Sequence, residues 1–136
     1  MSDLSITVGN CLNSDAATET RIAAESITQG QALYAASSTT VGLADNNAAG
    51  KTVCVGIALN PATAGQPVTY AKGTDGSYGI TLGATMTAGL DYYLSANAGG
   101  ICPVGDLSSG MAKFHIGFAS STTVLKMQLK SYGVTL

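Results

Sequence analysis

The sequence contains one segment that resembles a phosphate-binding loop. Residues 49–52 read Ala-Gly-Lys-Thr, like the end of the pattern Gly, four residues, Gly, Lys and Ser or Thr. The first glycine of that pattern is replaced by Asp45, whose carboxylate would repel a phosphate group. A strand pattern also follows this segment, whereas the motif needs a helix there. We therefore do not expect a nucleotide site.

Serine and aspartate also fail to form the arrangements that hydrolytic catalysis uses. Ser77 stands in Gly-Ser-Tyr-Gly, one position away from the serine of a Gly-x-Ser-x-Gly nucleophile turn. Four aspartates fall mostly in turns or at the starts of strands, where Asp normally bonds its own backbone; they are Asp45, Asp75, Asp91 and Asp106. The sequence therefore predicts a protein that is not an enzyme and carries no cofactor.

Histidine and cysteine are too few and too scattered to predict a metal site. His115 is the only histidine, and a zinc site generally needs four ligands. We expect it at the surface or in a subunit contact. The three cysteines, Cys11, Cys54 and Cys102, are odd in number and lack the Cys-x-x-Cys spacing. We expect small, partly buried, reduced thiols, and a structural disulfide is the alternative.

The charge pattern argues against nucleic acid and membranes as partners. Charged residues make up only 10% of the chain, against about 25% in an average soluble domain. The net charge is −2 and the six basic residues are scattered, with only Lys126 and Lys130 on one strand face. The apolar runs are far shorter than the roughly 20 residues that span a bilayer. The start, Met-Ser-Asp, predicts no secretory signal.

The segment Val53 to Leu59 is repeated later in the chain. It alternates large apolar residues with small ones, and Phe114 to Ala119 does the same, with Gly117 in the place of Gly56. Upstream, Ile27 to Tyr34 resembles Met86 to Tyr93, with Gly89 in the place of Gly30. We interpret this as two pseudo-repeats, at about residues 27–71 and 86–130, that close over a shared core.

Short alternating segments separated by Gly, Asn and Ser predict an all-β fold. We expect a compact β-barrel or sandwich of about ten short strands, built from the two pseudo-repeats, with little or no helix. Residues 18–136 would form a single β domain, and residues 1–17 an N-terminal arm or edge strand. A short helix within Ala16 to Glu25 is the alternative to a strand there. Period-two alternation predicts the residues on the buried face of each repeat. In the first repeat they are Val53, Val55, Ile57 and Leu59. In the second they are Phe114, Ile116 and Phe118, with Lys113 and His115 on the opposite face.

Both ends of the chain carry alternating apolar residues. At the start these are Leu4, Ile6 and Val8, and at the end Tyr132, Val134 and Leu136. Either they contact a neighbouring subunit or the capsid, or they complete the protomer's own sheet.

Four segments of the repeat, spread along residues 18–129, resemble a known family. They are Ile27-Thr-Gln-Gly30, Val53-Cys-Val-Gly-Ile-Ala58, residues 62–68 (Ala-Thr-Ala-Gly-Gln-Pro-Val) and Met86-Thr-Ala-Gly89. This pattern resembles the small tailed-phage head-decoration proteins, also called capsid cement proteins. The resemblance is one of sequence style, and the loop from Lys72 to Tyr78 and the apolar C-terminal tail depart from it.

The resemblance implies a virion structural protein, made in the host cytoplasm, that stabilises the outside of an icosahedral phage capsid. Its partners would be copies of itself, most simply as a homotrimer, and the phage major capsid protein, between whose hexamers such trimers commonly bind. The alternatives are another phage structural component, such as a tail-tube or fibre subunit, and a cellular ligand-binding β module or small enzyme.

Overall fold

The computed structural model describes residues 4, 6, 11–13, 15–48, 50–103, 107 and 112–135. All regular elements in these residues are β-strands, which confirms the predicted all-β fold. Eleven strands are present there: β1 (Leu12–Asn13), β2 (Ala17–Ala23), β3 (Ala32–Ala35), β4 (Thr40–Leu43), β5 (Cys54–Ala58), β6 (Pro67–Lys72), β7 (Gly79–Thr81), β8 (Asp91–Leu94), β9 (Ile101–Pro103), β10 (Ala112–Ala119) and β11 (Val124–Thr135).

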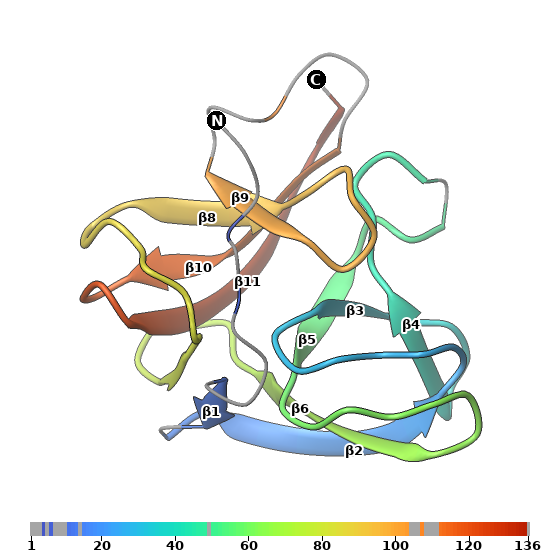
Figure 1. Cartoon of the computed structure of the whole chain (residues 1–136). Helices are drawn as coiled ribbons and strands as arrows, with labels where there is room; N and C mark the ends of the chain where they lie inside the picture. The colour runs from blue at the N-terminus through green and yellow to red at the C-terminus, as the bar shows by residue number, and fades with distance from the viewer. Residues whose placement is uncertain are drawn as a thin grey trace.

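The strands form two adjacent units with the same internal order (Figure 1). The first unit, β2 to β6, closes into a barrel in the order β2-β4-β3-β5-β6. The second unit, β7 to β11, belongs to an open sheet in the order β1-β7-β11-β10-β8-β9. Because the barrel is closed, its order can equally be written β4-β3-β5-β6-β2. In the second unit the order is β9-β8-β10-β11-β7, so, apart from the β2–β4 pair that closes the barrel, each strand pair of the first unit matches the pair numbered five higher in the second. The predicted repeat thus corresponds to two five-stranded units of matching order, which also include β2 and β7, outside the predicted ranges 27–71 and 86–130.

The turn that precedes β3 has an equivalent before β8. The Gly30 amide donates to the Ala58 carbonyl at 2.8 Å, and the Gly89 amide donates to the Ala119 carbonyl at 2.7 Å. Gly30 has a φ of 87° and Gly89 a φ of 84°, both in the left-handed region that favours glycine. The two glycines are thus required by the same backbone conformation.

Strand β5 carries a β-bulge. Leu33 of β3 pairs with Gly56, but its neighbour Tyr34 pairs with Cys54, so Val55 is an extra residue opposite β3. A bulge shifts the alternation of side chains by one residue along the bulged strand.

Strand β10 carries the same bulge in the second unit. Tyr92 of β8 pairs with Gly117 and Tyr93 pairs with His115, so Ile116 is the extra residue. Val55 directly precedes Gly56, and Ile116 directly precedes Gly117. The two bulges therefore occupy equivalent positions of the repeat.

The two bulges make part of the predicted face assignment wrong. Val53, on the face predicted to be buried, is 57% exposed, whereas Ile57 is fully buried as predicted. In the second unit Phe114 and Ile116 are buried as predicted, but so is His115, which strict alternation assigns to the opposite, outward face. The irregular alternation at each bulge accounts for the difference.

A glycine next to each bulge lies against the backbone of the neighbouring strand. A Cβ atom on Gly56 would lie 2.4 Å from the Ala71 carbonyl oxygen, and a Cβ on Gly117 would lie 2.0 Å from the Lys126 carbonyl oxygen. Both distances are far shorter than a normal contact, so only glycine allows β5 and β10 to approach their neighbours this closely.

The core has two hydrophobic clusters, one of which joins the units. The smaller cluster lies in the first unit and consists of Ala23, Ile27, Leu33, Val41, Ala58, Ala62, Val68 and Tyr70. The larger cluster includes Ile57 and Ala71 from the first unit together with Ile116, Leu125 and Met127 from the second. Strand β5 lies between the clusters, because Ile57 belongs to the larger one and Ala58 to the smaller. The two units therefore share a core.

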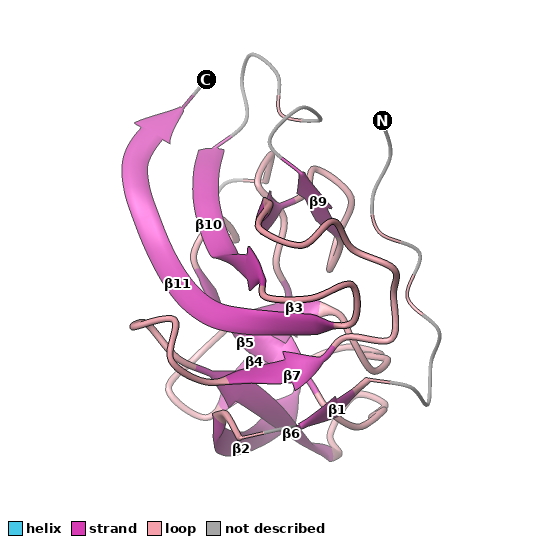
Figure 2. Ribbon diagram, turned by 90° about the vertical axis from the view of Figure 1, so that its left-hand side faces the viewer, coloured by secondary structure: helices cyan, strands magenta, loops and turns pink. Residues whose placement is uncertain are grey.

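The described residues near the start of the chain contact both units, and the C-terminal residues up to Thr135 belong to the second unit. Leu12 of β1 pairs with Thr81 of β7, so β1 is an edge strand, and the Leu4 amide donates to the Ile101 carbonyl of β9 at 2.8 Å. Strand β11 is a long curved strand of 12 residues that runs to Thr135 (Figure 2). The C-terminal tail thus continues this strand.

Candidate functional site

A cluster of charged side chains joins β2 to β6 in the first unit. Glu19 on β2 is paired in register with Tyr70 on β6, and the Tyr70 hydroxyl donates to its carboxylate. The Arg21 Nε atom lies 3.2 Å from one oxygen of Glu19, and the Lys72 Nζ atom lies 3.4 Å from the other. Two cations and one anion leave this cluster with one positive charge, although the whole chain has a net charge of −2.

These contacts change the acidity of two groups. The hydrogen bond from Tyr70 is the main cause that lowers the pKa of Glu19, with Lys72 and Arg21 adding to it against some desolvation. Burial, followed by the hydrogen bond to Glu19, raises the pKa of Tyr70 to about 12. At neutral pH the cluster therefore consists of a carboxylate held by a neutral phenol and two cations.

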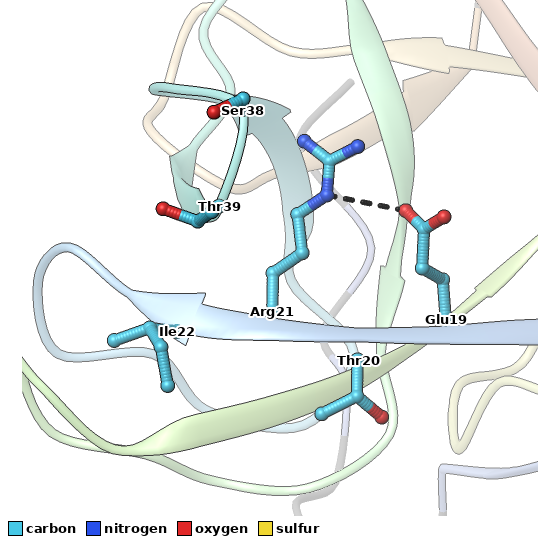
Figure 3. A pocket seen from close by; sticks show the side chains of 6 residues that line it. All are labelled: Glu19, Thr20, Arg21, Ile22, Ser38 and Thr39. Atoms are coloured by element: carbon cyan, nitrogen blue, oxygen red, sulfur yellow. Dashed lines mark ion pairs between the residues drawn. The ribbon is translucent and has the colours of Figure 1, made fainter.

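A hollow of about 390 Å³ opens beside this cluster. It is lined by Glu19, Thr20, Arg21, Ile22, Ser38 and Thr39. Figure 3 shows Arg21 and Glu19 rising on the same side of β2, joined by their ion pair, with Thr20 on the other side and Ser38 and Thr39 on the facing turn. The lining offers hydroxyl groups, a guanidinium group and strand backbone, which suit a polar ligand or a polypeptide segment. In the sequence, this site is indicated only by the opposite charges of Glu19 and Arg21, which stand at alternate positions and so share one face of the strand. Neither residue was predicted to belong to a site.

His115 is buried, so its predicted place at the surface is wrong. Its Nδ1 atom lies 2.8 Å from the Gln128 carbonyl oxygen and its Nε2 atom 3.2 Å from Oδ1 of Asp91. Both partner atoms are oxygens, one of the main chain and one of a carboxylate. The imidazole ring also makes an edge-to-face contact with the Tyr93 ring, with the two ring centroids 5.3 Å apart. His115 therefore ties β10 to β11 and β8. Within the part of the chain that the structure describes, no group of three His, Cys, Asp or Glu side chains could hold a metal ion.

The segment that resembles a phosphate-binding loop is used for structure. Asp45 accepts a hydrogen bond from the Asn47 amide at 2.9 Å, as expected for an Asp in a turn. The Lys51 ammonium lies 5.8 Å from the centroid of the Tyr34 ring, a cation–π contact. Strand β5 follows where a nucleotide site would need a helix. Ala49 lies outside the described residues.

Asp75 and Asp91 also have hydrogen-bond partners. Asp75 accepts a hydrogen bond from the Ser77 amide at 3.0 Å, which is again a turn contact. Asp91 starts β8 and holds His115, and Asp106 lies outside the described residues.

All three cysteines are buried, and none of them forms a disulfide bond. Burial raises the pKa of Cys11 to about 11 and that of Cys54 to about 12. Both thiols are therefore protonated at neutral pH and are poor nucleophiles.

The predicted contact residues are only partly within the described structure. Leu4 and Ile6 are half-buried and pack against the larger cluster of their own chain. The backbones of Tyr132 and Val134 belong to β11, but their side chains, as well as Val8 and Leu136, lie outside the described residues. Their role in subunit or capsid contacts stays a prediction.

Among the residues that the structure describes, four other large apolar side chains are exposed, and their exposure was not predicted. Leu12 and Tyr78 are 57% and 53% exposed near the β1–β7 edge, and Val53 and Ile22 are 57% and 38% exposed on the first unit. Alternation alone could not identify them, because their exposure depends on which strands become sheet edges.

No protein-family model matches this sequence. A search of curated protein sequences also finds no match. No helix in the described residues is long and apolar enough to cross a membrane.

Proposed function

We propose that this protein is a virion structural protein that decorates and stabilises the outside of an icosahedral phage capsid. It acts as a homotrimer bound between hexamers of the major capsid protein, it is made in the host cytoplasm, and it has no catalytic role.

The observation that carries this proposal is that the family-like segments form the repeated framework of the fold. Ile27 to Gly30 and Met86 to Gly89 form the matched turns, and Val53 to Ala58 contains the bulged strand that recurs in the second unit. The resemblance thus involves structurally equivalent positions in both units, which supports the inference that it reflects a shared architecture.

The surface chemistry is also compatible with long-lived adhesion. Charged residues make up only 10% of the chain, so few charges lose water when the surface is covered. Leu12 and Tyr78 add exposed apolar area near one sheet edge. A stable interface buries about 1,000 Å² or more, and a symmetric shell repeats each contact many times, so modest contacts add up.

The proposal is tested by mixing the purified protein with undecorated heads of the phage that encodes it and sedimenting the mixture. We expect the protein to sediment with the heads, to remain in solution with unassembled major capsid protein, and to have the mass of a trimer in solution. An unrelated protein of similar mass serves as the control for trapping. Failure to sediment with the heads would contradict the proposal.

The alternatives give different results in the same preparations. A tail-tube or fibre subunit would form rings or rods in electron micrographs without heads. A cellular binding module would stay monomeric and would melt at a higher temperature with its ligand, because a ligand that binds only the folded state stabilises it.

A further inference from the structure

Strand β2 has an unpaired edge along much of its length. On one side it pairs with β6 from Ala17 to Ile22, but on the other side it pairs with β4 only at Ile22 and Ala23. The Ala23 amide donates to Gln66 on the β6 side, and the Ile22 amide donates to Thr39 on the β4 side. Alternate residues of β2 therefore form their backbone hydrogen bonds on opposite sides of the strand.

This alternation assigns the backbone groups of Thr18 and Thr20 to the open edge. Residues on the β6 side have odd numbers and residues on the β4 side have even numbers, because N–H and C=O groups of alternate residues point to opposite edges of a strand. Within the described ranges, the backbone groups of Thr18 and Thr20 have no hydrogen-bond partner. Two donors and two acceptors are thus available at strand spacing.

The space next to this edge is open. Strand β4 begins at Thr40, and the turn before it diverges from β2, which leaves the hollow of about 390 Å³ next to Thr20. Ser38 and Thr39 form the far side of this hollow, as seen in Figure 3. An added strand would therefore find both unpaired backbone groups and room beside them.

The charge of the hollow favours one kind of occupant. Arg21 is the only cation among the described residues that line the hollow, and Lys72, which does not line it, binds the same Glu19 carboxylate. Glu19 therefore neutralises Arg21 only in part, which leaves positive charge beside the hollow. A segment that directs a carboxylate into the hollow would complement that charge.

A second copy of β2 is a poor occupant of the edge. Antiparallel pairing that uses both Thr18 and Thr20 would place Thr18 opposite Thr20 of the second copy. Glu19 would then lie directly opposite Glu19 of the second copy, and like charges in that position destabilise a strand pair. The two neighbouring registers need either Ile22, whose amide is already bonded to Thr39, or Ala16, which also has a partner already. The edge is thus better suited to a foreign strand.

We propose that the open edge of β2 accepts an extended segment of a partner protein, which adds a strand at Thr18 and Thr20 and directs an acidic side chain into the hollow. Strand addition of this kind derives its affinity from backbone hydrogen bonds and its specificity from side-chain contacts. This inference rests on the proposed function, in which the partner is the major capsid protein of the assembled shell.

Thr20→Pro tests the proposal, with Thr20→Ala as its matched control. Both variants lose the side-chain hydrogen bond of 2.8 Å to Thr69. Only proline removes the outward amide, and no native backbone hydrogen bond is lost with it. We expect Thr20→Ala to bind undecorated heads like the unmodified protein and Thr20→Pro to bind at least about tenfold more weakly, the effect of losing about 1.4 kcal/mol.

Hydrogen exchange of the unmodified protein gives a second test that does not depend on the folding of a variant. The amides of Thr18 and Thr20 should exchange rapidly in the free protein and at least about tenfold more slowly on heads, whereas those of Glu19 and Arg21, paired with β6, should be protected in both states.

The outcomes separate the two proposals. If the unmodified protein binds heads but Thr20→Pro binds equally well and exchange at Thr18 and Thr20 is unchanged, the strand-addition inference is wrong and the proposed function stands. If the unmodified protein does not bind heads, the proposed function fails and the inference with it. If Thr20→Pro alters the oligomer mass in the absence of heads, the occupant is a second copy and the inference is overturned.

Discussion

Replacement of Gly117 by alanine should be among the most damaging single-methyl changes in this protein. The added Cβ would lie 2.0 Å from the Lys126 carbonyl oxygen and 3.1 Å from its carbon. A carbon and a carbonyl oxygen normally approach no closer than about 3.3 Å. Because the obstacle is backbone, rotation of a side chain cannot relieve the clash, and β10 and β11 must separate locally by roughly 1 Å.

The expected loss of stability follows from this separation. Gly117 is paired with Met127 and Phe118 with Lys126, so the movement weakens the ladder at two positions. Two hydrogen bonds at about 1 kcal/mol each, together with an overpacking cost of about 1–3 kcal/mol, give a loss of about 3–5 kcal/mol. That is a large part of the roughly 5–15 kcal/mol that stabilises a typical domain.

Urea unfolding, followed by circular dichroism, measures this effect. With a slope of about 2 kcal/mol per M, the midpoint of Gly117→Ala should fall by roughly 2 M. Gly89→Ala is the control, because Gly89 also has a special conformation, with a φ of 84°, but an added Cβ meets nothing within 4 Å. Its cost should be only about 1–2 kcal/mol of backbone strain. If Gly117→Ala lowers the midpoint no more than Gly89→Ala does, the close approach of β10 and β11 is not the reason for the glycine.

Three further predictions concern the core, the thiols and the charged cluster. Ile57→Asp and Ile116→Asp should each abolish folding, because each buries an unpaired carboxylate. Lys126→Ala, on the outward face of β11, should change the unfolding free energy by less than about 0.5 kcal/mol. Circular dichroism of the purified proteins checks both, and equal damage from the lysine change would mean that the buried and outward faces are assigned the wrong way round. The three cysteines should resist a thiol reagent in the folded protein and react fully in urea. Since burial raises the pKa of Cys54 from 9.0 to about 12, stability should fall as the pH rises above 9, by on the order of 1 kcal/mol per pH unit, and an alkaline series of melting temperatures without that decline would contradict its burial. The pKa of Glu19 is lowered in the folded state, so its stabilising effect should be present above the ordinary carboxylate pKa and disappear as the pH falls through the folded value; the melting temperatures of Glu19→Gln and the unmodified protein should converge in acid.

The strands were predictable because their cause is local. Alternating apolar residues bounded by Gly, Asn and Ser indicated most of the strands, and the matched glycines, Gly30 with Gly89 and Gly56 with Gly117, indicated the repeat. The buried positions of Ile57 and Leu125 follow from the same alternation.

The exceptions have non-local causes. The extra residues Val55 and Ile116 look like ordinary strand residues, and only the partner strands make them bulges. The burial of His115 depends on Asp91 and on a carbonyl of β11, which are distant in the sequence.

The open edge of β2 was also beyond the reach of the sequence. It exists because β4 pairs with β2 at only two positions, and strand pairing of this kind is set by the tertiary fold. The charges of Glu19 and Arg21 were visible in the sequence, but the hollow between β2 and the turn before β4 was not.

The larger hydrophobic cluster makes each unit dependent on the other. Because Ile57 and Ala71 of one unit are covered by Ile116, Leu125 and Met127 of the other, a polypeptide that carried a single unit would leave this face in water. A single unit would therefore need a second copy of itself or another partner to cover this face. The shared face is thus buried although the two units differ in closure, since the first is a closed barrel and the second belongs to an open sheet bordered by the N-terminal strand.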